Sequence, residues 1–282
     1  MIRGWLKARL DDVGLVAHAY DLRARVGYAL DRPTQRENAR FRATGAPDGL
    51  PLPPPSLVYL VAGHFNLGWF YESGVSHERW LTDALVRNGF SLDDVAAVLD
   101  FGCGCGRVTR HWHGDQSFEI HGTDYNRRLV DWCSRSLTFA KFETNGDAPP
   151  LPYDDARFSF IYAISVFTHL VEASQHAWMR ELERVLAPGG VLAITTKGRS
   201  RVERLGDDER NRFERGELVV QDERYAGRNL CAAYHPEPYV RESLADALEV
   251  LDFVPAAPGG EQSQDLYLLS KPRSLDESAE VR

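Results

Sequence analysis

The sequence contains few cysteines and no long apolar run. Only four of its 282 residues are cysteine, which is too few for a disulfide framework and favours a reducing, cytoplasmic environment. Uninterrupted apolar runs of about 18 residues are absent, so no transmembrane helix is expected. The charged N-terminus, MIRGWLKARLDD, lacks the apolar segment of a signal peptide. We therefore expect a cytoplasmic protein without a transmembrane segment.

The sequence also lacks an excess of basic residues. It has 33 Lys and Arg against 41 Asp and Glu, a formal net charge of −8, which argues against nucleic acid as a partner. Residues 1–45 differ, with nine basic against five acidic residues. A solvated helical face explains this local excess, and a basic surface that meets an anionic substrate or a membrane remains the alternative.

Proline, glycine and charge divide the chain into segments. Helix-like spacing of apolar residues before a stiff proline-rich stretch predicts a helical extension. Two further helices, broken near Gly68 and Gly74, are expected before the core begins. The predicted organisation is an N-terminal helical cap over residues 1–88 with a linker at 47–55, a core over 89–272 with a charged lid or substrate insert at 197–234, and a flexible tail over 273–282. The cap helices either cover the chain's own site or pair with a second subunit as a homodimer.

The core alternates strand-like and helix-like segments. Five strands are expected, each followed by a helical pattern or a glycine turn, at residues 95–101, 118–124, 141–145, 158–167 and 191–196. This alternation predicts an α/β fold with a parallel sheet and helices on both faces. A helix at 236–248 precedes two more strands at 251–255 and 265–270, which suggest an antiparallel edge.

A glycine-rich turn follows the first core strand. The segment Val98-Leu99-Asp100-Phe101-Gly102-Cys103-Gly104-Cys105-Gly106-Arg107 has G-x-G-x-G spacing. A dinucleotide site requires G-x-G-x-x-G, and Arg107 stands where its third glycine would fall. Asp100, two residues before the first glycine, suits a ligand with a cationic amino group. The spacing therefore counts against a pyrophosphate ligand.

Two more acidic residues follow the next strands. Asp124 ends the strand-like segment FEIHGTD, and Asp147 lies in the loop TNGDAPP. A carboxylate at the first position can accept both hydroxyls of a ribose, and one at the second can accept from an adenine amino group. Open α/β sheets bind ligands at the carboxyl ends of their strands, where all three acids are expected.

Four segments in this order resemble the successive motifs of class I S-adenosylmethionine-dependent methyltransferases. They are VLDFGCGCGR, HGTDYN, NGDAPPLP with the following FSFIYAISVFTHL, and RVLAPGGVLAITTKG. The resemblance covers roughly residues 95–197. It implies a Rossmann-like, mostly parallel seven-stranded sheet with an antiparallel last strand. It also implies S-adenosylmethionine as cofactor and S-adenosylhomocysteine as product.

The resemblance further implies which residues hold the cofactor. The turn from Asp100 to Gly106 would hold its amino acid part, Asp124 its ribose, and Gly146 with Asp147 its adenine. Ser165 and Val166 would line its methionine side. The full set of expected cofactor-binding residues is Asp100, Gly102, Cys103, Gly104, Gly106, Asp124, Tyr125, Gly146, Asp147, Ser165 and Val166.

Methyl transfer to a hydroxyl needs a base, and two histidines are candidates. His169 follows the fourth strand, where it would face the methyl group, and His235 begins the helix after the insert. Packing beneath a helix is the alternative role of each. Expected acceptor contacts come from the aromatic-rich cap segment, namely His64, Phe65, Trp69 and Tyr71. No metal site is expected, because no cluster of ligating residues stands out and Cys103 and Cys105 suit packing.

These features predict a methyltransferase for a small-molecule acceptor, with an oxygen of a sugar or secondary metabolite as the target. An NAD(P)-dependent oxidoreductase is the second interpretation, which Arg107 disfavours. A non-catalytic relative that only binds the cofactor is the third, and the retained acids argue against it. A protein or RNA methyltransferase stays open and would require a basic groove at the methyl site.

Overall fold

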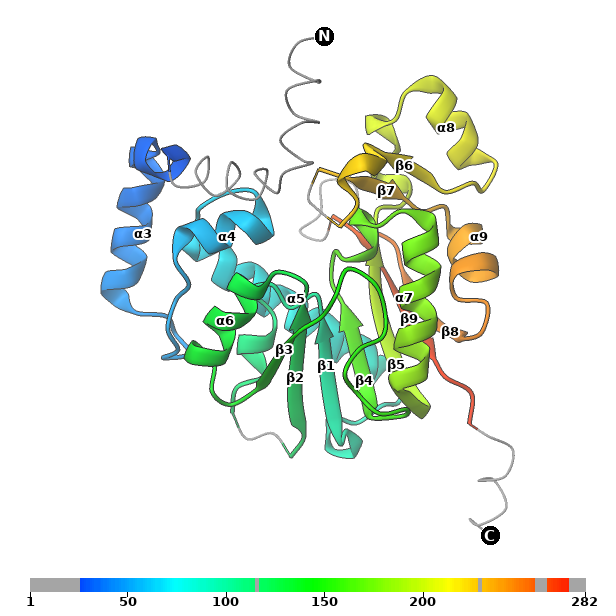
Figure 1. The fold of residues 1–282 in the computed structure, drawn as a ribbon, viewed down its shortest axis with the longest axis horizontal. Helices are drawn as coiled ribbons and strands as arrows, with labels where there is room; N and C mark the ends of the chain where they lie inside the picture. Colours follow the sequence, from blue (N-terminus) through cyan, green and yellow to red (C-terminus); the bar gives the residue numbers. More distant parts are fainter. Residues whose placement is uncertain (1–25, 115–116, 228–229, 257–262, 274–282) are drawn as a thin grey trace.

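A seven-stranded sheet forms the centre of the computed structural model, which describes residues 26–114, 117–227, 230–256 and 263–273 (Figure 1). The strand order is β3-β2-β1-β4-β5-β9-β8. The strands β1 to β5 pair in parallel, and β9 runs antiparallel between β5 and β8. The strands are β1 (Ala97–Phe101), β2 (Glu119–Asp124), β3 (Lys141–Thr144), β4 (Phe158–Ala163), β5 (Leu186–Thr196), β8 (Glu249–Val254) and β9 (Asp265–Ser270). The predicted fold class, a Rossmann-like sheet with an antiparallel last strand, is confirmed.

Alternation along the strands places neighbouring side chains on opposite faces of the sheet. Val98 packs with Leu81 and Leu85 of α5 (Leu67–Arg87). Leu99, the next residue, packs instead with Leu182 of α7 (Glu172–Val185). Because each face needs its own apolar cover, the two helices lie on opposite sides, α7 in front of the sheet and α5 partly hidden behind it in Figure 1.

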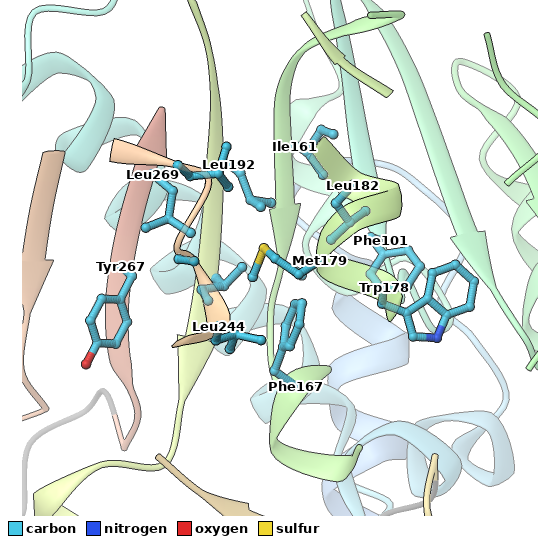
Figure 2. Close-up of a cluster of buried hydrophobic side chains, with 14 of the residues drawn as sticks. Phe101, Ile161, Phe167, Trp178, Met179, Leu182, Leu192, Leu244, Tyr267 and Leu269 are labelled. Atoms are coloured by element: carbon cyan, nitrogen blue, oxygen red, sulfur yellow. The ribbon is translucent and has the colours of Figure 1, made fainter. Parts of the chain in front are cut away.

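The larger core cluster lies between α7 and the sheet (Figure 2). Met179 points into the middle of this cluster, toward Phe167. Trp178 packs on Phe101, the last residue of β1, with ring centroids 4.9 Å apart. The aromatic pair therefore anchors the end of β1 immediately before the glycine-rich turn.

The parallel strands end beneath two peripheral groups of elements. One group contains α3 (Arg32–Thr44), α4 (Pro55–Ala62) and the start of α5, which pack with α6 (Arg127–Ser136). The other contains η4 (Arg199–Arg204), α8 (Asp207–Glu214), β6 (Val219–Gln221), η5 (Glu223–Tyr225) and β7 (Ala232–Tyr234). An α-helical turn α9 (Glu237–Tyr239) and a π-helical turn η6 (Val240–Leu244) then lead into β8.

The helix break in the cap was placed wrongly by the sequence. Residues 63–66 separate α4 from α5, and α5 continues through both Gly68 and Gly74. Gly74 is needed for space, because an added Cβ would collide with the Arg107 carbonyl oxygen and approach Nε2 of His111 at 2.5 Å. The absence of a side chain therefore lets α5 lie directly on the segment after the glycine-rich turn.

The other predicted elements match more closely, with two differences. After the first strand and its glycine-rich turn, where RVTRHW was expected to begin a helix, the chain forms only a short 3₁₀ turn, η2 (Thr109–Trp112). The turn expected at 187–190 lies within β5, where the β4 ladder passes from the Phe158–Leu186 pair to the Phe160–Val191 pair. The remaining turns are η1 (Leu92–Asp94) and η3 (Phe167–His169).

The predicted division into cap, core, insert and tail stays a prediction. Most of the first predicted cap helix, residues 1–25, and most of the tail, 274–282, lie outside the described residues. Among the helices that the structure describes, none has the length and apolar character to cross a membrane.

Candidate active site

A cavity of about 1150 Å³ opens at the carboxyl ends of the parallel strands. Its walls come from the loops after β1, β2, β3 and β4, from α4 and α5, and from residues 226–227 of the insert. The volume suits a cofactor together with part of an acceptor, since pockets for single drug-sized ligands span roughly 300–1,000 Å³.

The glycine-rich turn forms the floor of this cavity. Gly102 and Cys103 donate their backbone N–H groups to the Thr123 carbonyl at 2.8 and 2.9 Å, which ties the turn to β2. Gly104 has φ 57°, and an added Cβ would lie 2.8 Å from Val61 of α4. Only glycine meets both conditions without strain. The turn therefore packs directly against α4 and lines the cavity between the sheet and the cap.

Asp124 bridges this turn and the start of α6. Its Oδ2 accepts from the Gly104 N–H at 3.0 Å, and its Oδ1 accepts from the Asn126 N–H at 2.8 Å. Burial raises the pKa of Asp124 to about 6, against the lowering effect of the two backbone hydrogen bonds. The carboxylate is thus fixed at the tip of β2 and lines the cavity.

Asp100 lies behind the glycine-rich turn and is only 4% exposed. It accepts a hydrogen bond from the Thr109 hydroxyl at 2.5 Å and is also bonded by the Tyr162 side chain. Burial raises its pKa to about 6, while these hydrogen bonds and the nearby Arg107 lower it. Two acidic side chains therefore line one cavity from neighbouring strands.

The loop after β3 lines the far side of the cavity with Asn145, Gly146 and Asp147. The Oδ1 atom of Asn145 is buried and has no hydrogen-bond partner among the described residues. Asp147 is exposed and lines the rim. This side therefore presents a carbonyl oxygen and a carboxylate, both of which accept hydrogen bonds.

Ser165, just after β4, adopts a backbone conformation that is unusual for a residue other than glycine, with φ 63°. Its N–H donates to Thr195 Oγ1 at 2.8 Å, and its hydroxyl accepts from Gln264 Nε2 at 2.8 Å. Thr195 donates in turn to Gln264 Oε1 at 2.6 Å. A closed network from β4, β5 and the segment before β9 thus holds Ser165 at the cavity wall.

His169 lies in η3, and the insert holds it by two main-chain hydrogen bonds. Its Nδ1 lies 2.7 Å from the Cys231 carbonyl oxygen, and its own carbonyl accepts from the Gly227 N–H at 2.7 Å. Burial, aided by the charge of Lys197, lowers the pKa of His169 to about 4. The imidazole is therefore neutral at neutral pH. Because a carbonyl only accepts, the proton is on Nδ1 and Nε2 is free to accept one.

Comparison with known proteins agrees with this geometry. Residues 99–194 match the family model described as "Methyltransferase domain". The malonyl-[acyl-carrier protein] O-methyltransferase of Enterobacter lignolyticus (strain SCF1) is 28% identical over 145 residues, 51% of this chain and 56% of that protein. Methyltransferase GfsG of Streptomyces halstedii is 34% identical over 109 residues, 36% of this chain and 38% of that protein. The chain spans about half the length, or less, of these curated relatives.

Solved structures share the fold. A SAM-dependent methyltransferase from Methanosarcina mazei superposes with a TM-score of 0.50 at 18% identity, covering 67% of this chain and 98% of that one. The 1,6-didemethyltoxoflavin-N1-methyltransferase of Burkholderia thailandensis, solved with S-adenosylhomocysteine, gives a TM-score of 0.51 at 18% identity, covering 72% and 80%.

Residues 99–194 therefore match a methyltransferase domain, and the sheet has the fold found in S-adenosylmethionine-dependent methyltransferases. This assignment removes the dinucleotide-dependent oxidoreductase interpretation. The residues present also fit the cofactor of this superfamily. The buried Asp124 can accept from ribose hydroxyls, Asp100 lies where an ammonium group would be neutralised, and the unpartnered Asn145 Oδ1 can accept from an adenine amino group.

Most of the residues predicted to contact this methyltransferase cofactor line the cavity. They are Asp100, Gly102, Cys103, Gly104, Asp124, Tyr125, Gly146, Asp147, Ser165 and Val166. The structure places Gly106 outside the lining, because its position faces the side chain of Leu137 beneath the turn. His169 lies at the cavity as well.

Several other predicted residues lie away from the cavity lining. His235 is fully buried, and its Nε2 lies 3.0 Å from Gln175 Oε1. Phe65 stacks on Tyr59 at 4.7 Å. His64 packs on Trp69, and Tyr71 packs on His111 at 4.9 Å. Of the four aromatic cap residues predicted to contact the acceptor, only Trp69 lines the cavity, where it is 43% exposed.

Other cavity residues were not predicted as site residues. They include Arg107, Glu72, Ser73, Ser76 and His77 near the cap, and Ser174, Trp178 and Gln264 elsewhere. A charged residue directly after a glycine-rich turn was a usable signal for Arg107. Gln264 gave no local signal, since its place depends on β9 pairing with β5. No group of three His, Cys, Asp or Glu side chains suited to a metal ion occurs in the part of the chain that was searched, the described residues.

Proposed function

We propose that this protein transfers the methyl group of S-adenosylmethionine to an oxygen of a small-molecule acceptor, a sugar or a secondary metabolite, with His169 as the general base. The observation that carries the proposal is the tautomer of His169. A neutral imidazole with its Nδ1 proton held by the Cys231 carbonyl leaves Nε2 ready for the proton of a hydroxyl. Methylation of an amine or thiol would require such a base less.

The residues of the cavity support a cofactor in one orientation. Asp124 would accept from the ribose hydroxyls, with Tyr125 beside it, and Asn145 to Asp147 would bind the adenine. Asp100 and the glycine-rich turn would hold the amino acid part, beside Ser165 and Val166. When bound, the cofactor supplies an electrophilic sulfonium methyl group, so that positioning the acceptor provides much of the acceleration.

The acceptor would lie between the cap and the insert. The exposed Trp69 offers an apolar face for a sugar ring or an aromatic metabolite, and Ala226 with Gly227 lines the opposite wall. The name of one relative, a sterol 24-C-methyltransferase from Schizosaccharomyces pombe, also supports a small-molecule acceptor. The name of another, an O-methyltransferase from Penicillium expansum, supports an oxygen as the target.

His235 has no part in this mechanism. It lies outside the cavity lining, and burial lowers its pKa to about 3. With its Nε2 beside Gln175, which itself donates to the Leu170 carbonyl at 2.9 Å, it would support the loop after η3. We assign His235 a packing role in place of the predicted catalytic one. The proposal also includes a homodimer through the N-terminal helices and no nucleic acid partner.

The test compares wild type with His169→Gln and with His113→Gln as a matched control at an exposed histidine. S-adenosylhomocysteine binding is measured by calorimetry, and methyl transfer is measured with radiolabelled cofactor against a panel of sugars and phenolic metabolites. We expect all three proteins to bind S-adenosylhomocysteine alike. We expect His169→Gln to lose roughly 10²- to 10⁴-fold in rate, the usual contribution of a general base.

The outcomes separate the parts of the proposal. Full activity of His169→Gln on a hydroxyl acceptor would exclude His169 as the general base. Transfer only to amines would overturn the oxygen target. A folded wild type that binds no S-adenosylhomocysteine would overturn the proposed activity as a whole.

A further inference from the structure

Arg107 is a buried cation in the cavity wall that forms no ion pair within the described residues, although the charge of Asp100 acts on it from a longer distance. Arg107 is 9% exposed, and no carboxylate of the described residues lies within ion-pair distance of its guanidinium. Its Nη1 reaches the Ser73 carbonyl at 3.5 Å and His77 Nδ1 at 3.0 Å. By contrast, Arg110 is held by Asp48 through two bonds of 2.7 and 2.9 Å. The charge of Arg107 is therefore poorly satisfied by the protein alone.

The neighbours of Arg107 on α5 do not compensate its charge. His77 Nδ1 lies 2.6 Å from the Ser73 carbonyl as well as 3.0 Å from the guanidinium. One nitrogen cannot donate to the carbonyl and accept from Arg107 at the same time, so one of these contacts is always unfavourable. Glu72 also lines the cavity, but it forms no ion pair with Arg107 within the described residues.

The place of Arg107 relative to Asp100 suggests the chemistry of its partner. The two residues lie on either side of the glycine-rich turn, line the same cavity and interact electrostatically. A carboxylate beside an acid would be repelled, whereas a group that bears both an ammonium and a carboxylate satisfies both residues. Trp69 flanks the guanidinium, with its ring centroid 5.9 Å from Cζ.

We propose that Arg107 binds a carboxylate in the cavity, through the guanidinium nitrogens that the protein leaves without acceptors. The carboxylate comes either from the methionine half of the cofactor or from the acceptor, and the pairing with Asp100 favours the first source. The inference rests on the proposed function, because it assumes S-adenosylmethionine as the methyl donor. A planar guanidinium recognises a carboxylate through two parallel hydrogen bonds, which a lysine ammonium cannot reproduce.

The test is a ligand-by-variant comparison. Wild type, Arg107→Gln and Arg107→Lys are titrated calorimetrically with S-adenosylhomocysteine and with its decarboxylated analogue, which retains the amine. Arg87→Gln, at a partly exposed surface arginine paired with Asp252, is the matched control. We expect Arg107→Gln to weaken S-adenosylhomocysteine binding by tenfold or more and to leave binding of the analogue unchanged. Arg107→Lys should restore part of the loss, because it keeps the charge.

A second arm distinguishes the acceptor as the source. If neither variant changes binding of S-adenosylhomocysteine, the loaded protein is titrated with succinate. Succinate binding by wild type that is lost in Arg107→Gln assigns the carboxylate to the acceptor. Absence of succinate binding overturns the inference, and so does an equal weakening of both cofactor analogues, which indicates a structural role. A wild type that binds neither analogue contradicts the proposed function instead.

Discussion

Individual acidic residues of the site combine burial with a fixed orientation. The carboxylates of Asp100 and Asp124 are both kept at a pKa of about 6, chiefly by burial. Each is predicted to act in its ionised form, Asp124 toward hydroxyls and Asp100 toward an ammonium group. Cofactor affinity should therefore depend on protonation of these two groups in a range where exposed carboxylates are fully ionised.

The corresponding prediction concerns the pH dependence of S-adenosylhomocysteine binding. If the ionised acids bind the ligand better, each must release its proton on binding at low pH. The apparent dissociation constant should then be flat near neutrality and rise below a pH of about 6, by up to tenfold per pH unit for each proton released. Calorimetry at several pH values measures this, and Asp124→Asn should show a shallower dependence. A constant affinity down to about pH 5 would contradict it.

At this scale the sequence predicted residues whose roles follow from local order along the chain. An acid at the end of a strand and a glycine-rich turn before a helix keep their places in any sheet of this topology. Arg107 and Gln264 could not be assigned in the same way, because their surroundings are made by α5 and by the pairing of β9 with β5. The same applies to Phe65 and Tyr71, whose aromatic character fits both a pocket and a packed cap.

At the scale of elements, the close contact of α5 with the glycine-rich segment matters most. The sequence predicted the helices of the cap and most of the sheet from periodicity. It placed the helix break wrongly because glycine serves two purposes. At residues 63–66 the chain leaves α4 through a left-handed glycine, Gly63, whereas Gly74 inside α5 makes room for the Arg107 backbone. Periodicity carries no information about such a contact.

Two substitutions of the same kind on α5 should have opposite effects. Gly68→Ala meets only ordinary contacts, 3.4 Å from Asn66 Oδ1, and should leave stability unchanged or raise it by up to about 1 kcal/mol. Gly74→Ala would force α5 away from Arg107 and should lower the free energy of unfolding by about 1–3 kcal/mol. Urea denaturation of both variants measures the difference. Equal stability of the two would contradict the proposed contact.

On the scale of the whole molecule, histidines buried in the neutral form couple folding to pH. Burial is the largest cause that lowers the pKa of His77, His111 and His169 to about 4 and of His235 to about 3. The unfolded chain protonates them near their ordinary pKa of about 6.5, so the stability they contribute is present above that pH and is lost as the pH falls toward 4. The raised pKa values of Asp100 and Asp124 act in the opposite direction below about 6.

Together these groups predict a net uptake of about two protons on unfolding near pH 5, four from the histidines against two held by the folded acids. The free energy of unfolding should therefore fall by about 2.7 kcal/mol per pH unit in this range. Denaturant titrations at about pH 7, 6 and 5 measure the slope. Rising stability on acidification would show that the two acids, not the histidines, dominate.

The insert and His169, the proposed general base, are joined by two hydrogen bonds that involve main-chain atoms, from Gly227 to the His169 carbonyl and from His169 to the Cys231 carbonyl. The segment of the insert that would line the acceptor space thus also determines which nitrogen of the His169 imidazole carries the proton. Redesign of the insert for a new acceptor would change reactivity together with selectivity. A library that varies the lining side chains but keeps the backbone of residues 226–227 and 230–231 should keep a working base, whereas loop grafts of a different length should not.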